Sequence, residues 1–478
     1  MSTHYETVIG LEIHAQLLSR TKLFCPCSTA FGGTPNSNVC PVCLGLPGSL
    51  PVLNRAAVQM AVRAGLALDC EIQRSSVFAR KNYFYPDLPK GYQISQYEEP
   101  LATNGHLEIE VDGVRRRVGI IRIHMEEDAG KNVHGVGGDS LVDLNRTGVP
   151  LIEIVSAPDM RSSAEAAAYM KALRDVLVFI GVNDGNLQEG SFRCDANVSI
   201  RRCGDEKLGT RCELKNLNSF RFVQRAIEAE VARQVGIVET GGYVQQETRA
   251  FDPETGLTRT LRSKEEAHDY RYFPEPDLPP MIVEEALVEA QREQLGELPN
   301  AVRARWTGEL GLSVQTAATL SQHPGYVRFF ERAREHCSDV IRLANWMQTE
   351  VLRSAKLHGL DAEFTVTPEQ LAELVSLVES GKINGKIAKQ VFSAMEGTTR
   401  SAKEVVEELG VAPMADAAAV EDMCRALLAS HPEQAAAVRA GKKGIIGFFV
   451  GKIMQQTKGS ADPRLVNETL EKLLGSGA

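Results

Sequence analysis

Four cysteines near the amino end of the chain have the residue type and the spacing of a zinc site. Cys25 and Cys27 are followed, about a dozen residues later, by Cys40 and Cys43. This pairing of Cys-x-Cys with Cys-x-x-Cys is close to the spacing by which thiolates bind one zinc ion. Four thiolates would complete the tetrahedron and leave no position for a substrate, so the sequence predicts a structural zinc. Free thiols or a degenerate site are the alternatives.

A second set of residues has the oxygen-rich chemistry of a harder cation. Glu12 and His14 alternate with apolar residues over 8–17, and Glu153 has apolar residues on both sides within 149–155. A buried, unpaired carboxylate is costly, so Glu153 needs a cation or a hydrogen-bond network. Several acids on separate strands with one histidine favour magnesium and nucleotide phosphates. The alternative for any one strand is a row of solvent-facing polar residues, which is ordinary in antiparallel sheets.

A phosphate site also needs positive charge, and the segment 80–93 supplies candidates. Arg80 and Lys81 open an aromatic, proline-containing stretch, and Lys90 precedes a glycine. A surface loop with ordinary lysines is the alternative. The sequence contains no Walker-type phosphate loop and no Gly-x-Ser-x-Gly nucleophile motif. No cysteine stands in an evident nucleophile motif, so a built-in glutaminase is not expected.

Alternating strands are the elements that must position these residues. Over the first ~290 residues the apolar residues recur with a period of two, which predicts an antiparallel sheet with some helices. The expected strands that carry polar residues on one face are 8–17, 120–127, 149–155, 192–201 and 211–215. A proline-rich loop is expected at 270–280. From about 284 to 397 the pattern is helical, including 326–337 and 340–358, with a helix start at Pro368.

Length and composition limit the classes of protein to consider. The 478 residues exceed one compact core, so two to four domains are expected. No apolar run is long enough for a membrane helix, and the first residues lack the features of a signal peptide. We therefore expect a cytoplasmic protein. The formal net charge of −9 argues against wholesale coating of nucleic acid, so any RNA contact requires a local basic patch.

One such patch lies near the carboxyl end. Its five cations have no acidic residue between them and surround the apolar run Gly-Ile-Ile-Gly-Phe-Phe; they are Arg439, Lys442, Lys443, Lys452 and Lys458. This pattern favours contact with an RNA backbone, which should weaken as salt increases. A solvated helix end and turn is the alternative.

Several ordered motifs resemble those of the B-subunit family of glutamyl/aspartyl-tRNA amidotransferases. They are GLEIHAQL at 10–17, CPVCLGLPG at 40–48, KNYFYPDLPKGY at 81–92, NRTGVPLIE at 145–153, CELKNLNS at 212–219, HDYRYFPEPDL at 268–278 and GFFVGK at 447–452. Each motif is moderately specific, whereas their ordered set is highly specific. The resemblance covers essentially the whole chain.

The resemblance implies an α+β fold with three domains. It implies a catalytic domain with an antiparallel sheet like that of glutamine synthetase at 1–293, which would contain the zinc knuckle at 25–43. It also implies an all-helical domain at 294–407 and a small helical tail of the YqeY type at 408–478 that contacts tRNA.

The resemblance also implies a reaction, site residues and partners. The enzyme would be a carbon–nitrogen ligase that uses ATP to phosphorylate the side-chain carboxylate of misacylated Glu-tRNA or Asp-tRNA and then amidates it with ammonia. An amidase A subunit would deliver the ammonia, and a small C subunit would complete a heterotrimer. The implied magnesium ligands are Glu12, His14, Glu127 and Glu153. Glu126 and Glu213 are possible further ligands that, with Glu12, would serve catalysis, and Lys81 would contact the nucleotide phosphates.

Two rival functions remain open at this point. A non-catalytic RNA-binding scaffold with a zinc knuckle would leave the repeated acids and Glu153 unexplained. A free-standing ligase acting on a small amino acid would leave the basic tail and the helical domains unexplained. The sequence does not tell whether Glu-tRNA, Asp-tRNA or both are the substrates.

Overall fold

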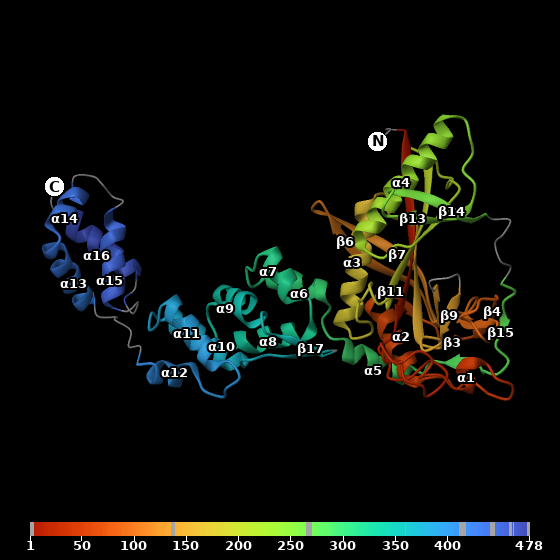
Figure 1. Cartoon of the computed structure of the whole chain (residues 1–478), viewed down its shortest axis with the longest axis horizontal. Coiled ribbons are helices and arrows are strands. Elements are labelled where there is room, and N and C mark those ends of the chain that lie inside the picture. Colours follow the sequence, from red (N-terminus) through yellow and green to blue (C-terminus); the bar gives the residue numbers. More distant parts are fainter. Residues whose placement is uncertain are drawn as a thin grey trace. The chain divides into compact units, whose positions relative to one another are not determined.

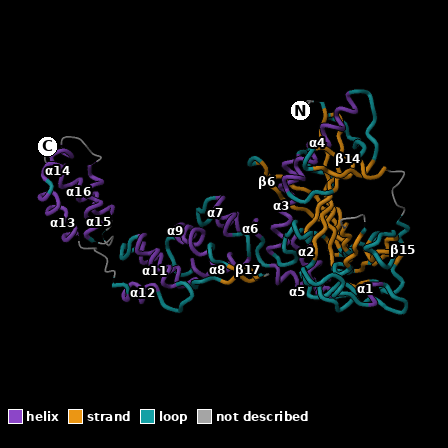
Figure 2. Tube along the Cα trace, viewed as in Figure 1, coloured by secondary structure: helices purple, strands orange, loops and turns teal. Residues whose placement is uncertain are grey.

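The computed structural model describes most of the chain as two compact units. The described residues are 4–134, 139–263, 270–358, 360–410, 417–439, 445–457, 461 and 463–475. The units are Met1–Pro299 and Asn300–Ala478. Strands dominate the first unit, whereas the second is almost wholly helical (Figure 2). This mixed architecture agrees with the predicted α+β class.

The largest sheet among the described residues has nine strands. Neighbouring strands are antiparallel except for β12 and β13, which are parallel. Their order across the sheet is β14 (Leu257–Ser263), β13 (Glu247–Asp252), β12 (Cys212–Lys215), β11 (Phe192–Arg202), β1 (Tyr5–Gln16), β10 (Pro150–Ser156), β7 (Val114–Glu127), β6 (Ala102–Val111) and β2 (Glu71–Ile72). The five strands expected from the sequence are therefore present and adjacent to one another.

Two helices cover one face of this sheet. α3 (Ser163–Phe179) contacts β6 and β1, and α4 (Phe220–Glu239) contacts β11 and β14 (Figure 1). Serine side chains cap both helices at their amino ends, where they accept backbone hydrogen bonds. On the central strand β1, Leu11, Ile13 and Ala15 are buried, while the alternate residues are half-buried. The period of two therefore assigns the apolar side chains to one face and the polar ones to the other.

Shorter elements complete the first unit. A three-stranded sheet has the order β15 (Phe273–Pro274), β4 (Phe78–Asn82) and β5 (Tyr92–Gln96), and β5 also contacts β7. Two pairs are β3 (Ser75–Ser76) with β16 (Met281–Ile282), and β8 (Lys131–His134) with β9 (Ser140–Asp143). The helices are α1 (Pro41–Leu44), α2 (Arg55–Ala67) and α5 (Glu285–Leu295). The segment expected to be an ordered loop at 270–280 thus contributes a short strand as well.

The second unit contains two separate hydrophobic cores. The first is built around Trp306, Phe330 and Phe392, and the second around Phe449, Val466 and Leu470. The helices of the first are α6 (Pro299–Gly308), α7 (Val314–Leu320), α8 (Pro324–Arg334), α9 (Val340–Trp346) with the π-helical turn η2 (Met347–Val351), α10 (Pro368–Glu379), α11 (Gly385–Met395) and α12 (Ala402–Glu408). Those of the second are α13 (Ala417–Ser430), α14 (Pro432–Arg439), α15 (Ile446–Gln456) and α16 (Pro463–Gly475).

The helix predicted at 340–358 extends beyond the observed helix, whereas the helix start predicted at Pro368 is confirmed. The pattern predicted a helix through residue 358, but β17 (Lys356–His358) pairs with β18 (Asp361–Glu363). A pattern within one segment does not detect the pairing of Leu357 with Ala362 that forms this hairpin. The predicted start of α10 is confirmed by a capping box at its amino end.

The domain limits predicted at 293/294 and 407/408 remain predictions. The first falls inside α5, whose residues Gln291 and Gln294 accept hydrogen bonds from Arg63 of α2. The second falls next to the last residue of α12. None of the helices in the described part of the chain has the length and hydrophobicity that a membrane crossing requires.

Candidate functional site

The register of three neighbouring strands places two histidines on either side of a glutamate. In the pairing of β1 with β10, His14 lies opposite Glu153, and in the pairing of β10 with β7, Glu153 lies opposite His124. Because side chains alternate along a strand, Glu126 lies on the same face of β7 as His124. We call His14, His124, Glu126 and Glu153 the carboxylate–histidine cluster.

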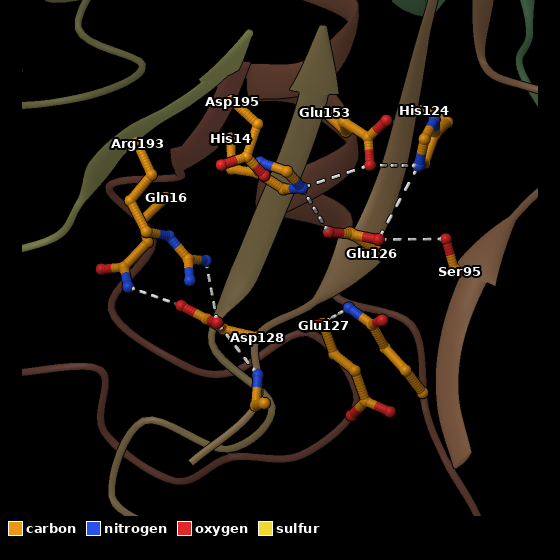
Figure 3. A network of polar contacts seen from close by, with 12 residues as sticks. His14, Gln16, Ser95, His124, Glu126, Glu127, Asp128, Glu153, Arg193 and Asp195 are labelled. Carbon is orange, nitrogen blue, oxygen red and sulfur yellow. Dashed lines mark hydrogen bonds and ion pairs between the residues drawn. The ribbon is translucent and has the colours of Figure 1, made fainter. Parts of the chain in front are cut away.

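The members of this cluster contact one another directly (Figure 3). Nε2 of His14 lies 3.2 Å from Glu153 Oε2 and 3.6 Å from Glu126 Oε1. Nε2 of His124 lies 3.4 Å from Glu153 Oε2 and 3.7 Å from Glu126 Oε2. The hydroxyl of Ser95 on β5 donates to Glu126 Oε2 at 3.2 Å. Both carboxylates are buried, so each depends on these partners.

Burial and charge act in opposite directions on the cluster. Burial lowers the pKa of both histidines, but the neighbouring carboxylates outweigh it and raise the pKa of His14, and that of His124 to about 9. Burial raises the pKa of Glu126 and Glu153, but the histidines outweigh it and hold both below their ordinary value. The histidines and the carboxylates therefore favour one another's charged forms.

The donor set also fits a divalent cation. One ligand atom from each of His14, Glu126 and Glu153 lies within 4.8 Å of the others. Two carboxylates and one imidazole form a set that hard cations such as Mg²⁺ or Mn²⁺ accept. The geometry thus brings together His14 and Glu153 from the predicted magnesium ligands with Glu126, one of the two possible further ligands.

Glu127 does not reach this group, although the family resemblance implied that it is a ligand. It follows Glu126 on β7, so its side chain leaves the strand on the opposite face (Figure 3). Its carboxylate Oε1 accepts from Lys90 Nζ and from the backbone N–H of Ile94 at 2.9 Å. The structure therefore gives Glu127 a lysine partner and brings Glu126 into contact with His14, and the ligand roles of both carboxylates stay predictions.

A second polar group continues across the same face on β1, β11 and β12. Glu12 accepts from Asn197 Nδ2 at 2.8 Å. Lys215 Nζ lies 2.6 Å from Asp195 Oδ2 and 2.8 Å from Glu213 Oε1. Burial and the charges of Glu153 and Glu213 raise the pKa of Glu12. A carboxyl group held at a raised pKa beside other acids is one that a cation would stabilise in its charged form.

Apart from Glu126, the residues of the two groups line one cavity of about 350 Å³. Four cations line it together with the acids, namely Lys81, Arg122, Arg211 and Lys215. Burial lowers the pKa of Lys81, but Glu126 and nearby groups outweigh burial and raise it, so the ammonium stays charged. Lys81 Nζ lies 4.9 Å from the centre of the Tyr270 ring. The cavity combines acids that can hold a metal with cations that can hold phosphate.

His124 belongs to the carboxylate–histidine cluster and lines the cavity, although the sequence did not single it out. A lone histidine beside an acidic run is more often a hydrogen-bonded structural residue than a ligand. A signal was nevertheless present, because Arg122, His124 and Glu126 are spaced by two residues and alternate with apolar Ile123 and Met125. That spacing places all three on the polar face of the strand.

The four predicted zinc ligands lie together. Sγ of Cys43 is 3.5 Å from that of Cys25, 3.7 Å from that of Cys40 and 3.8 Å from that of Cys27. A tetrahedron with zinc–sulfur bonds of about 2.3 Å has sulfur–sulfur edges of about 3.8 Å. We call these residues the cysteine cluster, and their spacing fits one zinc ion closely.

A buried lysine adds positive charge to the cysteine cluster. Nζ of Lys22, whose side chain is fully buried, donates to Cys43 Sγ at 3.3 Å and to the backbone oxygen of Asn38 at 2.7 Å. The hydrogen bond from Cys25 and the Lys22 charge lower the pKa of Cys43 to about 4. Burial raises the pKa of Cys27 to about 11. At least one thiolate is thus available for a metal at neutral pH.

The structure describes two of the five basic residues predicted to bind RNA. Arg439 is exposed at the end of α14, and Lys452 is exposed on α15. Lys442, Lys443 and Lys458 lie outside the described residues.

Comparison with known proteins gives matches along nearly the whole chain. Residues 7–289 match the family described as GatB/GatE catalytic domain, and residues 328–474 match the family described as GatB domain. A protein of Geotalea daltonii is 54% identical over 475 residues, one of Anaeromyxobacter sp. (strain Fw109-5) is 56% identical over 477, and one of Geobacter sulfurreducens is 53% identical over 476. Each alignment covers 98% of this chain and 99% of the relative, and each relative is named as the B subunit of an aspartyl/glutamyl-tRNA(Asn/Gln) amidotransferase. The chain therefore belongs to the GatB/GatE family of amidotransferase subunits.

Proposed function

We propose that this chain is the subunit of an ATP-dependent amidotransferase that converts misacylated Glu-tRNA(Gln), Asp-tRNA(Asn) or both into the correctly charged tRNAs. The observation that carries the proposal is the similarity to the B subunits of amidotransferases over 98% of the chain. The cavity supports it independently, because it places acids and cations where a nucleotide and a carboxylate substrate could meet. The enzyme is accordingly a ligase that forms a carbon–nitrogen bond.

The chemistry explains why such a cavity is needed. A carboxylate reacts poorly with ammonia because oxide is a poor leaving group. An oxygen of the substrate carboxylate therefore attacks the γ-phosphorus of ATP and ADP departs, after which ammonia displaces phosphate and leaves the amide. Phosphoryl transfer of this kind depends on positioning and on charge stabilisation more than on covalent help from the protein.

The carboxylate–histidine cluster would hold a magnesium ion for this reaction. Its donors would be His14, Glu126 and Glu153, with Glu12 and Glu213 placed along the same cavity as donors for a further cation. Bound Mg²⁺ supplies neutralisation of the phosphate charges. His14 would have to be neutral to bind the metal, so metal binding would compete with protonation of this imidazole.

Other residues of the cavity act on the substrates directly. Lys81 would contact a transferred phosphate with an ammonium whose charge the surrounding acids maintain. Arg122, Arg211 and Lys215 line the same cavity and can hold further phosphate or carboxylate oxygens. The buried strand residues below them keep these groups in place.

The finer architecture belongs to the same proposal. The first unit would be a catalytic domain like that of glutamine synthetase, limited to about 1–293, and the cysteine cluster would hold a structural zinc. The region 294–407 would be a helical domain, and 408–478 would be a YqeY-like domain that binds tRNA through Arg439, Lys442, Lys443, Lys452 and Lys458. The partners would be an amidase A subunit that supplies ammonia and a small C subunit.

Reconstitution tests the function and resolves the substrate. The chain is combined with the two partner subunits and given ATP, glutamine and either Glu-tRNA(Gln) or Asp-tRNA(Asn). Conversion of at least one substrate, with ATP consumption that depends on the misacylated tRNA, is the expected result. ATP consumption that is indifferent to the aminoacyl group would contradict the proposal.

A further inference from the structure

A stacked pair of tyrosines forms part of the cavity wall. The rings of Tyr97 and Tyr272 are 4.2 Å apart between centroids and only 5° from parallel. Both line the cavity together with Lys81. Tyr97 is nevertheless 51% exposed, so about half of the residue remains accessible although Tyr272 stacks on one face of its ring. An aromatic core contact would instead have buried both rings.

The backbone beside Tyr97 is held firmly. Tyr97 directly follows buried Gln96, whose side-chain oxygen accepts from the backbone N–H groups of Leu101 at 3.1 Å and Met125 at 3.0 Å. Tyr97 therefore leaves β5 at a fixed point beside β7.

The other tyrosine is held by a strained turn. Arg271, directly before Tyr272, has a φ of +42°, a conformation that a residue with a side chain rarely adopts. The side-chain amide of Asn82 on β4 donates to the backbone oxygen of Arg271 at 2.8 Å. The backbone N–H of Asn82 donates to the backbone oxygen of Tyr270 at 2.9 Å. Strain that the surrounding structure maintains is typical of functional sites.

The chemistry of the pair differs from that of most of the cavity. Most of the other lining residues are carboxylates, histidines, lysines and arginines, which hold charged parts of a ligand. The Tyr97–Tyr272 pair offers a flat, uncharged surface beside them. A ligand that extends from phosphates to a planar, uncharged ring would match both parts, and stacking of bases on aromatic side chains is a common mode of nucleotide recognition.

We propose that the open face of Tyr97 stacks on an adenine ring. The proposal rests on the function proposed above, which supplies two sources of adenine: ATP and the 3′-terminal adenosine of tRNA. Tyr272 supports Tyr97 from behind, and Asn82 keeps Tyr272 in position through the backbone of Arg271.

Binding measurements on the reconstituted complex separate the two sources. The ligands are ATP, inorganic tripolyphosphate, deacylated tRNA and the same tRNA trimmed of its terminal adenosine. For Tyr97→Ala we expect a loss of about 5- to 150-fold for the adenine-containing ligand, the range found when a stacking ring is removed. A loss for ATP but not for tripolyphosphate assigns the stacked ring to ATP. A loss for intact but not for trimmed tRNA assigns it to the terminal adenosine.

Two further variants of Tyr97 and one control variant distinguish the loss of the aromatic ring from other effects of the substitution. Tyr97→Phe should bind as the unaltered chain does because it keeps the ring, whereas Tyr97→Leu should resemble Tyr97→Ala because it keeps only apolar volume. Tyr243→Ala, at a tyrosine that is 92% exposed and does not line the cavity, should change nothing. Unchanged binding of both adenine-containing ligands by Tyr97→Ala overturns the proposal, as does an equal loss for tripolyphosphate. Failure of the unaltered complex to amidate tRNA would refute the proposed function instead, since stacking is read from binding alone.

Discussion

Replacing Glu153 by glutamine removes one negative charge from the centre of the carboxylate–histidine cluster and changes little else. The ligand atoms of His14, Glu126 and Glu153 lie within 4.8 Å of one another, so a cation bound by all three is a few ångströms from Glu153. A unit charge about 4 Å from another contributes about 4 kcal/mol at an effective dielectric constant of about 20. A divalent cation carries two charges and about 1.4 kcal/mol corresponds to tenfold, so the variant should bind a divalent cation at least about 1,000-fold more weakly.

Glu153→Gln should lower the free energy of unfolding by less than the breaking of a buried ion pair usually does. Removing one partner of a buried pair costs about 3–5 kcal/mol when the other charge is left unpaired. Here the partners are His14 and His124, whose pKa values are raised by Glu153 against the effect of burial. Without Glu153, burial favours their neutral forms, so they can lose protons at pH 7. We therefore expect the free energy of unfolding to fall by only about 1–2 kcal/mol.

The measurement uses Mn²⁺ as a paramagnetic substitute for Mg²⁺, with free Mn²⁺ followed by electron paramagnetic resonance. Amidation by the reconstituted complex and thermal unfolding are measured on the same preparations. Glu98→Gln is the matched control, because Glu98 is exposed and does not line the cavity. Binding of Mn²⁺ at the affinity of the unaltered chain, or amidation at its full rate, would refute the assignment of Glu153 as a ligand.

Three further predictions concern the rest of the chain. Cys40→Ser should lose bound zinc and melt several degrees lower, while turnover per folded molecule stays constant. Metal analysis, melting curves and amidation rates measure these three quantities, and a folded variant without turnover would make this metal catalytic. Removing the residues after Gly410 should weaken tRNA binding by at least about tenfold and leave ATP binding unchanged, and an unaltered tRNA affinity at moderate salt would count against a tRNA-binding tail. Glu230→Gln should cost about 3 kcal/mol, because buried Glu230 accepts from Arg233 at 2.7 Å and Gln234 at 2.8 Å. These partners outweigh burial and lower the pKa of Glu230, so its contribution is present above about pH 4.5 and is lost as pH falls further. Denaturant unfolding at pH 7 and pH 3 should therefore show a large difference between the two proteins only at pH 7.

The alternation of residues made much of the sheet predictable. Leu11, Ile13 and Ala15 are buried as the period of two requires, and the polar residues Glu12 and His14 between them face the cavity. Register is a different matter, because it depends on pairing between distant segments. That His14 lies opposite Glu153, and Glu153 opposite His124, follows from no pattern within one strand.

The face of β7 that carries Glu127 follows from the alternation of the strand. In the segment Ile-Arg-Ile-His-Met-Glu-Glu at 121–127, the apolar residues Ile123 and Met125 are buried on one face. Continuing that alternation places Glu127 on their face and Glu126 on the face of His124. The alternation therefore places Glu126, and not Glu127, on the face of the carboxylate–histidine cluster, while the ligand roles of both residues stay predictions.

Glu127 connects the two metal sites proposed here. Its partner Lys90 packs against Gly45 at the end of α1, the short helix that contains Cys43. The contact is so close that a Cβ added at Gly45 would lie only 2.4 Å from Lys90 Cγ. Gly45 also has a φ of 64°, so any side chain there would be disfavoured both by its backbone and by Lys90. The cysteine cluster fixes α1, α1 fixes the stem of Lys90, and Lys90 holds Glu127 at the end of the strand that carries Glu126. A zinc ion on soft sulfur ligands can thereby stabilise the position of hard oxygen ligands without taking part in their chemistry.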